Sequence, residues 1–259
     1  KWPIDVFKEL LPRIYMIVYE INERWCHELW NRYPGEWDRI REMAVMADGF
    51  VHMANLAVVG SYSVNGVAKI HTEILKKSVL KRFYEYSPSK FNNKTNGITH
   101  RRWLMKANPD LSEVITEAIG DSWMAHATDL LRLTNWETDP VFAEKVAMVK
   151  LANKERLAAY VQKTMGQKLN PHSIFDCQVK RIHSYKRQML NVLHIMDLAN
   201  RLRENPSLDI TPRTFIFAGK AAPSFYQAKR TIKLINSVAA MIDGDSLFKG
   251  RIKVIFLEN

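Results

Sequence analysis

The sequence has 259 residues and a formal net charge of +11 at pH 7; 47% of its residues are hydrophobic and 25% are charged. This length suffices for one large domain or for parts of two, and the apolar content excludes an intrinsically disordered chain. The basic balance favours a nucleic acid, a phosphorylated substrate or an acidic surface as partner, although a basic part of a larger molecule would carry the same charge.

The first part of the chain, residues 1–95, is predicted to be mainly helical. Pro12 suits the first turn of a helix. Apolar residues then recur at helical spacing, at Ile14, Ile17, Val18 and Ile21. The run FVHMANLAVVGS, residues 50–61, predicts a short strand that ends at Gly60, and VNGVAKIHTEILKKSVLKRF, residues 64–83, predicts a further helix.

A stretch without periodicity follows at YSPSKFNNKTNGITHRRW, residues 86–103. It is rich in Ser, Asn, Lys and Pro, and its Asn96-Gly97 pair is typical of a turn. We therefore place a domain junction in this stretch, which divides the chain into residues 1–95 and residues 96–259.

The remainder of the chain is predicted to alternate helices with strands. Asp139 and Pro140 are a suitable cap and first residue for a long helix that Gly166 would end. Three strand-like runs with two helices between them follow: SIFDCQVKRI, KRQMLNVLHIMDLANRLREN, RTFIFAGK, FYQAKRTIKLINSVAAMI and RIKVIFLEN. This βαβαβ order predicts an α/β fold with a parallel sheet, right-handed crossovers and helices on both faces.

Both helices of this pattern are amphipathic. In the first of them, Met189, Leu193 and Met196 share one face. In the second, the aligned apolar residues are Ile232, Ile235, Val238 and Ile242. Such faces are expected of helices that cover a sheet.

Cationic residues gather where the first of these strands ends. They are Lys180, Arg181, Lys186 and Arg187, with His183 and Tyr185 among them. Ligands of open α/β sheets bind beyond the carboxyl ends of the strands, and a helix that starts near His183 would add the partial positive charge of its free N–H groups. Arginine and lysine both suit phosphate, so we expect one phosphate or more at this place. A solvated, basic helix start explains the same residues without any ligand.

Other chemical motifs are weak or absent. Gly219-Lys220 lacks the earlier glycine and the Ser/Thr of a Walker motif, and no GxGxxG follows a strand, which argues against a nicotinamide or flavin enzyme. His71 has no metal-ligand spacing and is predicted to be an ordinary helix-surface residue. The tryptophans and tyrosines do not alternate with arginines, which argues against nucleic acid as the partner.

The cysteines and the apolar runs bear on the cellular setting. Cys26 and Cys177 are the only cysteines and form no CxxC motif, so no disulfide framework is expected. Cys177 lies in an apolar run and is predicted to be a small buried hydrophobe. Because no signal-peptide pattern and no apolar run of about 18 residues occurs, we expect a cytoplasmic protein without a membrane span.

Five sequence blocks are recognisable together: SVNGVAKIHTEILK, FNNKTNGITHRRWL, FDCQVKRIHSYKRQMLN, AGKAAPSFYQAKRTIKLI and KVIFLEN. In this order they closely resemble the glycogen (α-glucan) phosphorylase family, and the resemblance covers essentially the whole chain. It implies the GT-B architecture, in which two Rossmann-like domains face each other across a cleft. Residues 1–95 would then be the end of the N-terminal domain, and residues 96–259 would begin the C-terminal one.

The resemblance also implies an activity. Family members cleave terminal α-1,4-glucosidic bonds with inorganic phosphate, which gives glucose 1-phosphate. Their cofactor is pyridoxal 5′-phosphate, whose phosphate rather than ring assists the attack. Two adjacent phosphates would explain the dense positive charge, because several cations are needed to offset their repulsion. The implied partners are an α-1,4-glucan, inorganic phosphate and a second copy of the full-length protein, with no nucleic acid or membrane.

Matching the motif residue by residue assigns roles to the cationic stretch. Lys180 matches a lysine near the cofactor phosphate, and Arg181 matches the arginine that holds the substrate phosphate. Lys186 matches the lysine between the two phosphates, and Tyr185 a tyrosine that lines the same pocket. His183 matches the histidine of the motif, to which we assign positioning rather than proton transfer.

Three further residues are assigned from the resemblance. Asn96 matches an asparagine that hydrogen-bonds the glucosyl unit, and Val67 matches an apolar contact to that sugar. Trp103 matches a tryptophan near the cofactor. For Val67 and Trp103, packing in a core explains the residue nearly as well as ligand contact does.

Parts of the family pattern are missing. The lysine that forms the Schiff base with the cofactor lies beyond KVIFLEN in family members, and the first half of the N-terminal domain is missing as well. We therefore expect residues 1–259 alone to be inactive, and the activity to belong to the full enzyme. Two alternatives stay open: a GT-B sugar-nucleotide glycosyltransferase, and a non-enzymatic module that binds phosphate or nucleic acid.

Overall fold

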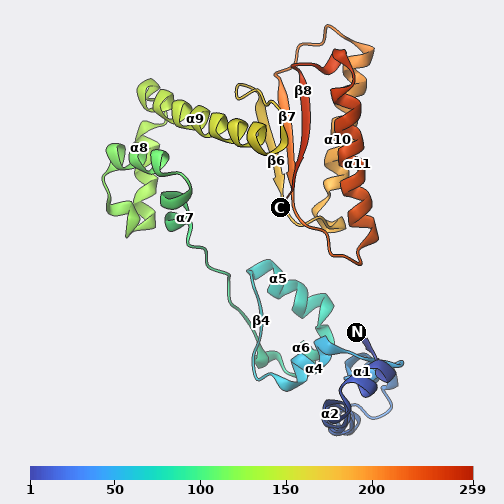
Figure 1. Ribbon diagram of the computed structural model, residues 1–259. Helices are drawn as coiled ribbons and strands as arrows, with labels where there is room; N and C mark the ends of the chain where they lie inside the picture. The colour runs from blue at the N-terminus through green and yellow to red at the C-terminus, as the bar shows by residue number, and fades with distance from the viewer. Residues whose placement is uncertain (259) are drawn as a thin grey trace. The chain divides into compact units, whose positions relative to one another are not determined.

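A computed structural model describes residues 1–258, which form two compact units (Figure 1). The first unit is Lys1–Thr99, and the second begins at His100. The boundary lies within the aperiodic stretch in which the sequence places the domain junction. No helix of the described residues is long and apolar enough to cross a bilayer.

The first unit is mainly helical, with two small sheets. Its helices are α1 (Ile4–Leu10), α2 (Pro12–Arg32), α3 (Trp37–Met43), α4 (Met53–Gly60), α5 (Lys69–Ile74) and α6 (Lys81–Tyr86). Its strands are β1 (Trp2–Pro3), β2 (Met46–Ala47), β3 (Phe50–Val51), β4 (Val64–Gly66) and β5 (Phe91–Asn93). Strand β3 pairs antiparallel with β1 and β2, whereas β4 and β5 pair in parallel.

Two elements of the first unit differ from the sequence prediction. The strand predicted over residues 50–61 is wrong, because only Phe50–Val51 is extended and Met53–Gly60 is the helix α4. A short apolar run does not distinguish a strand from a packed helix, and here Met, Ala and Leu favour the helix. The helix predicted over residues 64–83 starts only at Lys69, because Val64–Gly66 pairs with β5, and it is interrupted by a π-helical turn at Leu75–Val79.

The core of the first unit forms around one face of α2. Helix α2 begins at Pro12, as predicted, and it buries Val18, Asn22, Trp25 and Leu29. The Trp25 indole N–H donates to the Met43 carbonyl at 3.0 Å, and its ring stacks on Phe83. Trp25 therefore joins α2 to α3 and α6.

The second unit contains a parallel sheet. Its helices are α7 (His100–Ala107), α8 (Pro109–Ile119), α9 (Pro140–Met165), α10 (Gln188–Glu204) and α11 (Tyr226–Asp243). Its strands are β6 (Ile174–Val179), β7 (Arg213–Ala218) and β8 (Ile252–Leu257), in the order β6-β7-β8. The strands run parallel, with Val179, Ala218 and Leu257 in register, which confirms the predicted α/β class.

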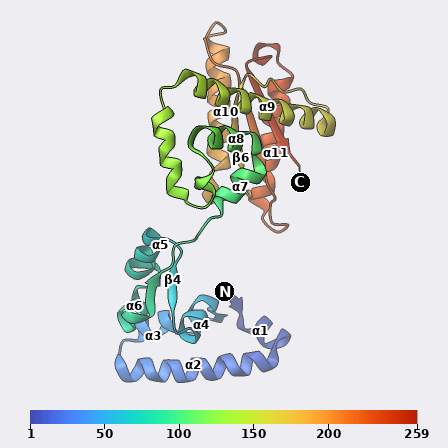
Figure 2. The same ribbon diagram turned by 90° about the vertical axis from the view of Figure 1, so that its left-hand side faces the viewer.

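Helices lie on both faces of this sheet. Helices α10 and α11 lie side by side on one face, and the end of α9 packs against the other (Figures 1 and 2). On the α9 side, Val161 contacts Ile216 of β7 and Ile255 of β8. The larger core lies beneath α10 and α11, around Phe215 and Phe217.

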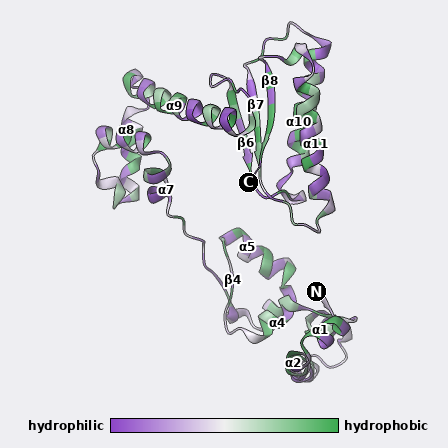
Figure 3. Ribbon diagram, in the orientation of Figure 1, coloured by the Kyte–Doolittle hydropathy of each residue, from purple (hydrophilic) through white to green (hydrophobic). Residues whose placement is uncertain are grey.

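The exposed face of α10 is the one that the sequence analysis singled out. Met189, Leu193 and Met196 are exposed, and the buried stripe consists of Val192, Ile195, Leu198, Ala199 and Leu202. Helix α10 carries apolar residues on more than one face (Figure 3), and helical spacing alone does not select the one that meets the sheet. In α11 the predicted alignment is confirmed, because Ile235, Val238 and Ile242 are buried.

The predicted burial of Cys177 is also wrong. Cys177 is exposed, and within residues 1–258 its strand β6 lies at the edge of the three-stranded sheet and pairs with β7 alone. An apolar strand sequence does not by itself indicate whether the strand is central or at an edge.

The start of α9 provides a test of local folding. The Asp139 side chain accepts a hydrogen bond from the Phe142 amide at 2.8 Å, and Gly166 ends the helix in the left-handed conformation, both as predicted. Asp139→Ala is expected to lower the free energy of unfolding by about 1 kcal/mol in chemical denaturation, because the cap is lost. Asp139→Asn keeps an acceptor oxygen and is expected to be nearly neutral; an equal loss in both variants would contradict the capping role.

Candidate functional site

The candidate site lies at the carboxyl end of β6, where the chain continues beside the end of β7. The Lys180 amide donates to the Ala218 carbonyl at 2.9 Å, and the Ile182 amide donates to the Lys220 carbonyl at 3.1 Å. The sheet pairing therefore extends past the last residue of each strand and fixes the backbone that carries Lys180 and Arg181.

Gly219 is required by this close pairing. Its φ is +145°, in a region that side chains disfavour, and an added Cβ would collide with the Lys180 carbonyl. Gly219 therefore allows the end of β7 to approach the backbone of the cationic segment. No phosphate-loop role is needed to explain it.

A single apolar residue anchors the segment to the core. Ile182 is 3% exposed and packs in the cluster beneath α10 and α11, whereas its neighbours Arg181 and His183 are exposed. Burial of Ile182 between two exposed polar residues keeps the charged groups at the surface of the sheet edge.

The segment then turns into α10. Ser184–Lys186 forms a 3-10 turn, in which the Lys186 amide donates to the His183 carbonyl at 2.9 Å. Arg187 follows in the left-handed conformation, with φ of +60°, and α10 begins at Gln188. The predicted order of strand, cations and helix is thus present, with the helix starting after the last cation.

Aromatic rings surround His183. Its ring lies 4.8 Å from that of Tyr185 and 5.0 Å from that of Phe225, measured between centroids. The Lys186 ammonium lies 5.5 Å from the centre of the Tyr185 ring, and Tyr185 itself is 71% exposed. These contacts bring His183, Tyr185 and Lys186 together and place the exposed imidazole beside two aromatic rings.

The cations of this segment lack carboxylate partners. Among residues 1–258, no ion pair within 4.0 Å involves Lys180, Arg181, Lys186 or Arg187. Some other cations of the unit do have carboxylate partners, such as Lys253, which pairs with Asp243 at 2.7 Å. Four neighbouring like charges without a counter-ion repel one another, and a bound anion would relieve that repulsion.

The residues assigned to the sugar lie in the first unit and near each other. The Asn96 amide donates to the Val67 carbonyl at 3.0 Å, directly beyond the paired strands β4 and β5. Val67 is 43% exposed and Asn96 is exposed. In the second unit, Trp103 lies on α7 and is 58% exposed. Neither Val67 nor Trp103 belongs to a hydrophobic core of residues 1–258.

The sequence analysis missed the amide side chains that hold the cationic segment. Gln188 is 2% exposed, and its side chain reaches the Arg181 carbonyl. Gln178 reaches the Lys186 carbonyl. A signal for Gln188 was available, because it continues the buried stripe of α10 at the spacing of Val192 and Ile195, a position where a polar residue is unusual.

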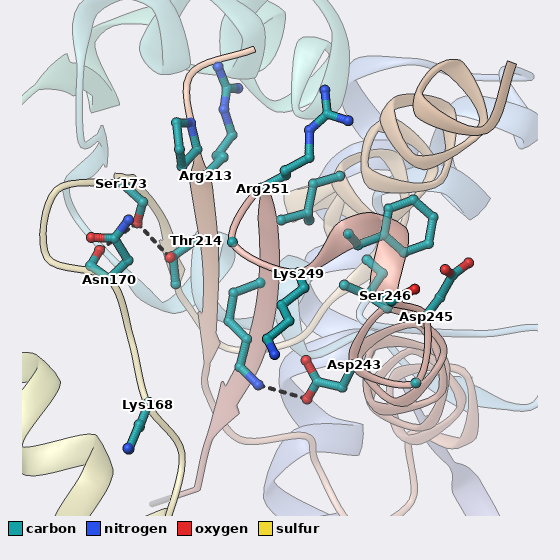
Figure 4. A pocket seen from close by; sticks show the side chains of 17 residues that line it. Lys168, Asn170, Ser173, Arg213, Thr214, Asp243, Asp245, Ser246, Lys249 and Arg251 are labelled. Atoms are coloured by element: carbon teal, nitrogen blue, oxygen red, sulfur yellow. Dashed lines mark hydrogen bonds and ion pairs between the residues drawn. The ribbon is translucent and has the colours of Figure 1, made fainter. Parts of the chain in front are cut away.

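A cavity at the other end of the same sheet does not compete with this site. A cavity of about 640 Å³ lies at the amino ends of the strands (Figure 4). Several of its polar side chains already have partners: Ser173 with Thr214, Lys253 with Asp243, and Arg251 with the Pro206 carbonyl. Ligands of open α/β sheets bind at the opposite end. Within residues 1–258, no group of three or more His, Cys, Asp or Glu side chains could hold a metal ion.

Comparisons with known proteins extend over the whole chain. A family model described as carbohydrate phosphorylase matches residues 1–259. The chain is 58% identical over 259 residues to a glycogen phosphorylase of Bacillus subtilis (strain 168), and 46% identical over 262 residues to the muscle form of Oryctolagus cuniculus. Each alignment covers all of this chain but only 32% and 31% of the relative, so the chain spans about a third of the length of the curated relatives it matches.

Gly219 provides a test of the site's architecture. Gly219→Ala is expected to lower the free energy of unfolding by about 1–3 kcal/mol, because the backbone is strained and the Lys180 carbonyl must move. The matched control is Gly60→Ala, where an added Cβ meets no atom within 4 Å and the backbone is unstrained. Equal stability of the two variants in chemical denaturation would contradict the close pairing of Gly219 with Lys180.

Proposed function

Because the chain belongs to the carbohydrate phosphorylase family, we propose that the full-length protein containing it is an α-glucan phosphorylase. Inorganic phosphate attacks the anomeric carbon of the terminal glucosyl unit, and the bond from that carbon to the glycosidic oxygen breaks. The oxygen leaves with a proton on the shortened glucan, and the product is glucose 1-phosphate. The observation that carries the proposal is a cationic segment at the carboxyl end of β6 without a paired carboxylate among residues 1–258, in a chain that the family model matches over its whole length.

The side chains of the cationic segment would act on phosphate in different ways. Arg181 presents a planar guanidinium, which binds two phosphate oxygens in a fixed geometry. Lys186 supplies a compact charge that neutralises the anion as it approaches the sugar. His183, which lies beside Tyr185 and Phe225, orients the turn that carries Lys186 and transfers no proton.

The residues present fit the phosphate end of pyridoxal 5′-phosphate. The observation that supports the fit is the absence, within residues 1–258, of any carboxylate paired with Lys180 or Arg181, which leaves charge for a second phosphate. Lys180 would hold that phosphate, and Trp103 would lie along the cofactor. When bound, the cofactor's phosphate would assist protonation of the attacking phosphate. No residue of this chain is proposed as the Schiff-base lysine.

Sugar recognition is proposed for the first unit. The Asn96 side chain would hydrogen-bond the glucosyl unit, and Val67 would contact its apolar face. The hydrogen bond from the backbone N–H of Asn96 to the backbone carbonyl of Val67 supports a shared role, because it holds the two residues next to each other. Further proposals from the family are a homodimer, a cytoplasmic location and an α-1,4-glucan as the polymer.

The two alternative functions receive less support. A sugar-nucleotide glycosyltransferase and a non-enzymatic phosphate or nucleic-acid binder would each explain a basic strand end. Neither explains a match to carbohydrate phosphorylases over residues 1–259.

Removal of one phosphate-binding cation tests the proposed function. In the full-length protein, Arg181→Ala is expected to lower the rate of glucose 1-phosphate formation from maltodextrin and phosphate about 100-fold or more, because a charge-stabilising donor is lost. Arg181→Lys is expected to recover only part of that rate, because the bidentate geometry is missing.

The matched control is Lys249→Ala, which removes an exposed cation at the opposite end of the sheet and is expected to leave the rate unchanged. Wild-type protein that forms no glucose 1-phosphate, or an Arg181→Ala variant that forms it at the normal rate, would refute the proposal.

A further inference from the structure

The cationic segment has little regular structure of its own. Between the end of β6 at Val179 and the start of α10 at Gln188, only the short turn Ser184–Lys186 is helical. Four like charges on such a segment would drive it apart, because repulsion favours conformations in which the charges separate. Sheet-like hydrogen bonds hold the amides of Lys180 and Ile182, and side-chain hydrogen bonds then hold the carbonyls of Arg181 and Lys186.

Gln188 holds the first of these positions. Its side-chain amide donates to the Arg181 carbonyl at 3.1 Å, and its side-chain oxygen accepts from the His183 amide at 3.4 Å. The side chain is almost completely buried, with 2% of the residue exposed. One buried amide thus bridges Arg181 and His183, the residues on both sides of Ile182. These two hydrogen bonds restrict the backbone conformation at Arg181.

Gln178 holds the second position. Its side-chain amide donates to the Lys186 carbonyl at 3.1 Å, and its side-chain oxygen accepts from the Asn191 side chain at 3.1 Å. The bridge therefore runs from β6 across the end of the turn to the first turn of α10. It also secures Arg187, whose left-handed backbone, with φ of +60°, is unfavourable for a side-chain-bearing residue.

An amide suits these positions better than a carboxylate does. A glutamine donates to a carbonyl without adding charge, so it fixes the backbone and leaves the cations free for an anion. A glutamate could not donate to the same carbonyl, and its charge would pair with the nearby cations and compete with phosphate. Both glutamines are therefore matched to an anion-binding segment and not merely to a turn.

We propose that Gln188 and Gln178 are positioning residues for phosphate, which fix the backbone of Arg181 and of Lys186, respectively. The inference rests on the proposed function. Neither glutamine is assigned contact with a substrate; each acts through the cation whose carbonyl it holds. A small displacement of a binding group is costly, since an error of about 1 Å in a reacting geometry can lower a rate about 100-fold.

The test uses the full-length protein and compares KM for phosphate with KM for maltodextrin. Gln178→Met keeps the length of the side chain and removes the amide, and it is expected to raise KM for phosphate about tenfold or more, with KM for maltodextrin nearly unchanged. Gln188→Met is expected to show the same selectivity. Gln178→Glu is expected to raise KM for phosphate at least as much as Gln178→Met, because it adds a competing charge.

Variants of Asn191 distinguish a positioning role of Gln178 from a general effect on stability. Because its side chain donates to the Gln178 oxygen, Asn191→Leu is expected to raise KM for phosphate less than Gln178→Met does, and to add nothing in the Gln178→Met background. The matched control is Asn236→Leu, which removes a similar amide-to-carbonyl hydrogen bond from the exposed side of α11 and is expected to change neither KM.

The outcomes distinguish this inference from the proposed function. If the wild-type protein forms no glucose 1-phosphate, the proposed function fails and the inference fails with it. If the wild type is active but the glutamine variants keep the wild-type KM for phosphate, or raise both KM values equally, the inference alone is overturned. Should Gln188→Met fold poorly because the site is buried, the half-buried Gln178 and Asn191 variants decide the question.

Discussion

Positive charge at the carboxyl end of β6, for which residues 1–258 supply no paired carboxylate, is the constraint on which the rest of the site depends. The charge is held in place by backbone pairing that continues from β6 and β7 into Lys180 and Ile182, and by a glycine that permits it. Ile182 ties the segment to the core, and buried amides tie it to α10. The folded structure thus holds close together cations that would otherwise move apart. This arrangement is preorganised to bind an anion.

The two units contribute different chemistry to the proposed reaction. The second unit carries the cations suited to phosphate, and the first carries Val67 and Asn96 at the ends of a small parallel pair of strands. The proposed reaction joins a phosphate to a sugar, so it uses residues of both kinds. The chain covers only 32% of one relative's length, yet it contains residues proposed to bind phosphate and residues proposed to bind the sugar.

Local signals predicted much of the second unit. The start and end of α9 followed from Asp139, Pro140 and Gly166, and the parallel sheet followed from alternating apolar runs. Features that depend on distant contacts could not be predicted in this way: which face of α10 is buried, and the edge position that exposes Cys177. The cationic cluster was visible in the sequence, but the residue roles came from the family resemblance. The Gln178 bridge was not visible, because its partners lie eight and thirteen positions away along the chain.

The most direct test of the central claim is to locate the anion. A crystal structure of the full-length protein with arsenate in place of phosphate would identify the anion by its anomalous scattering. The account predicts arsenate within hydrogen-bonding distance of the Arg181 guanidinium and the Lys186 ammonium, at the carboxyl end of β6. Arsenate bound elsewhere, with both of these side chains free in solvent, would contradict it.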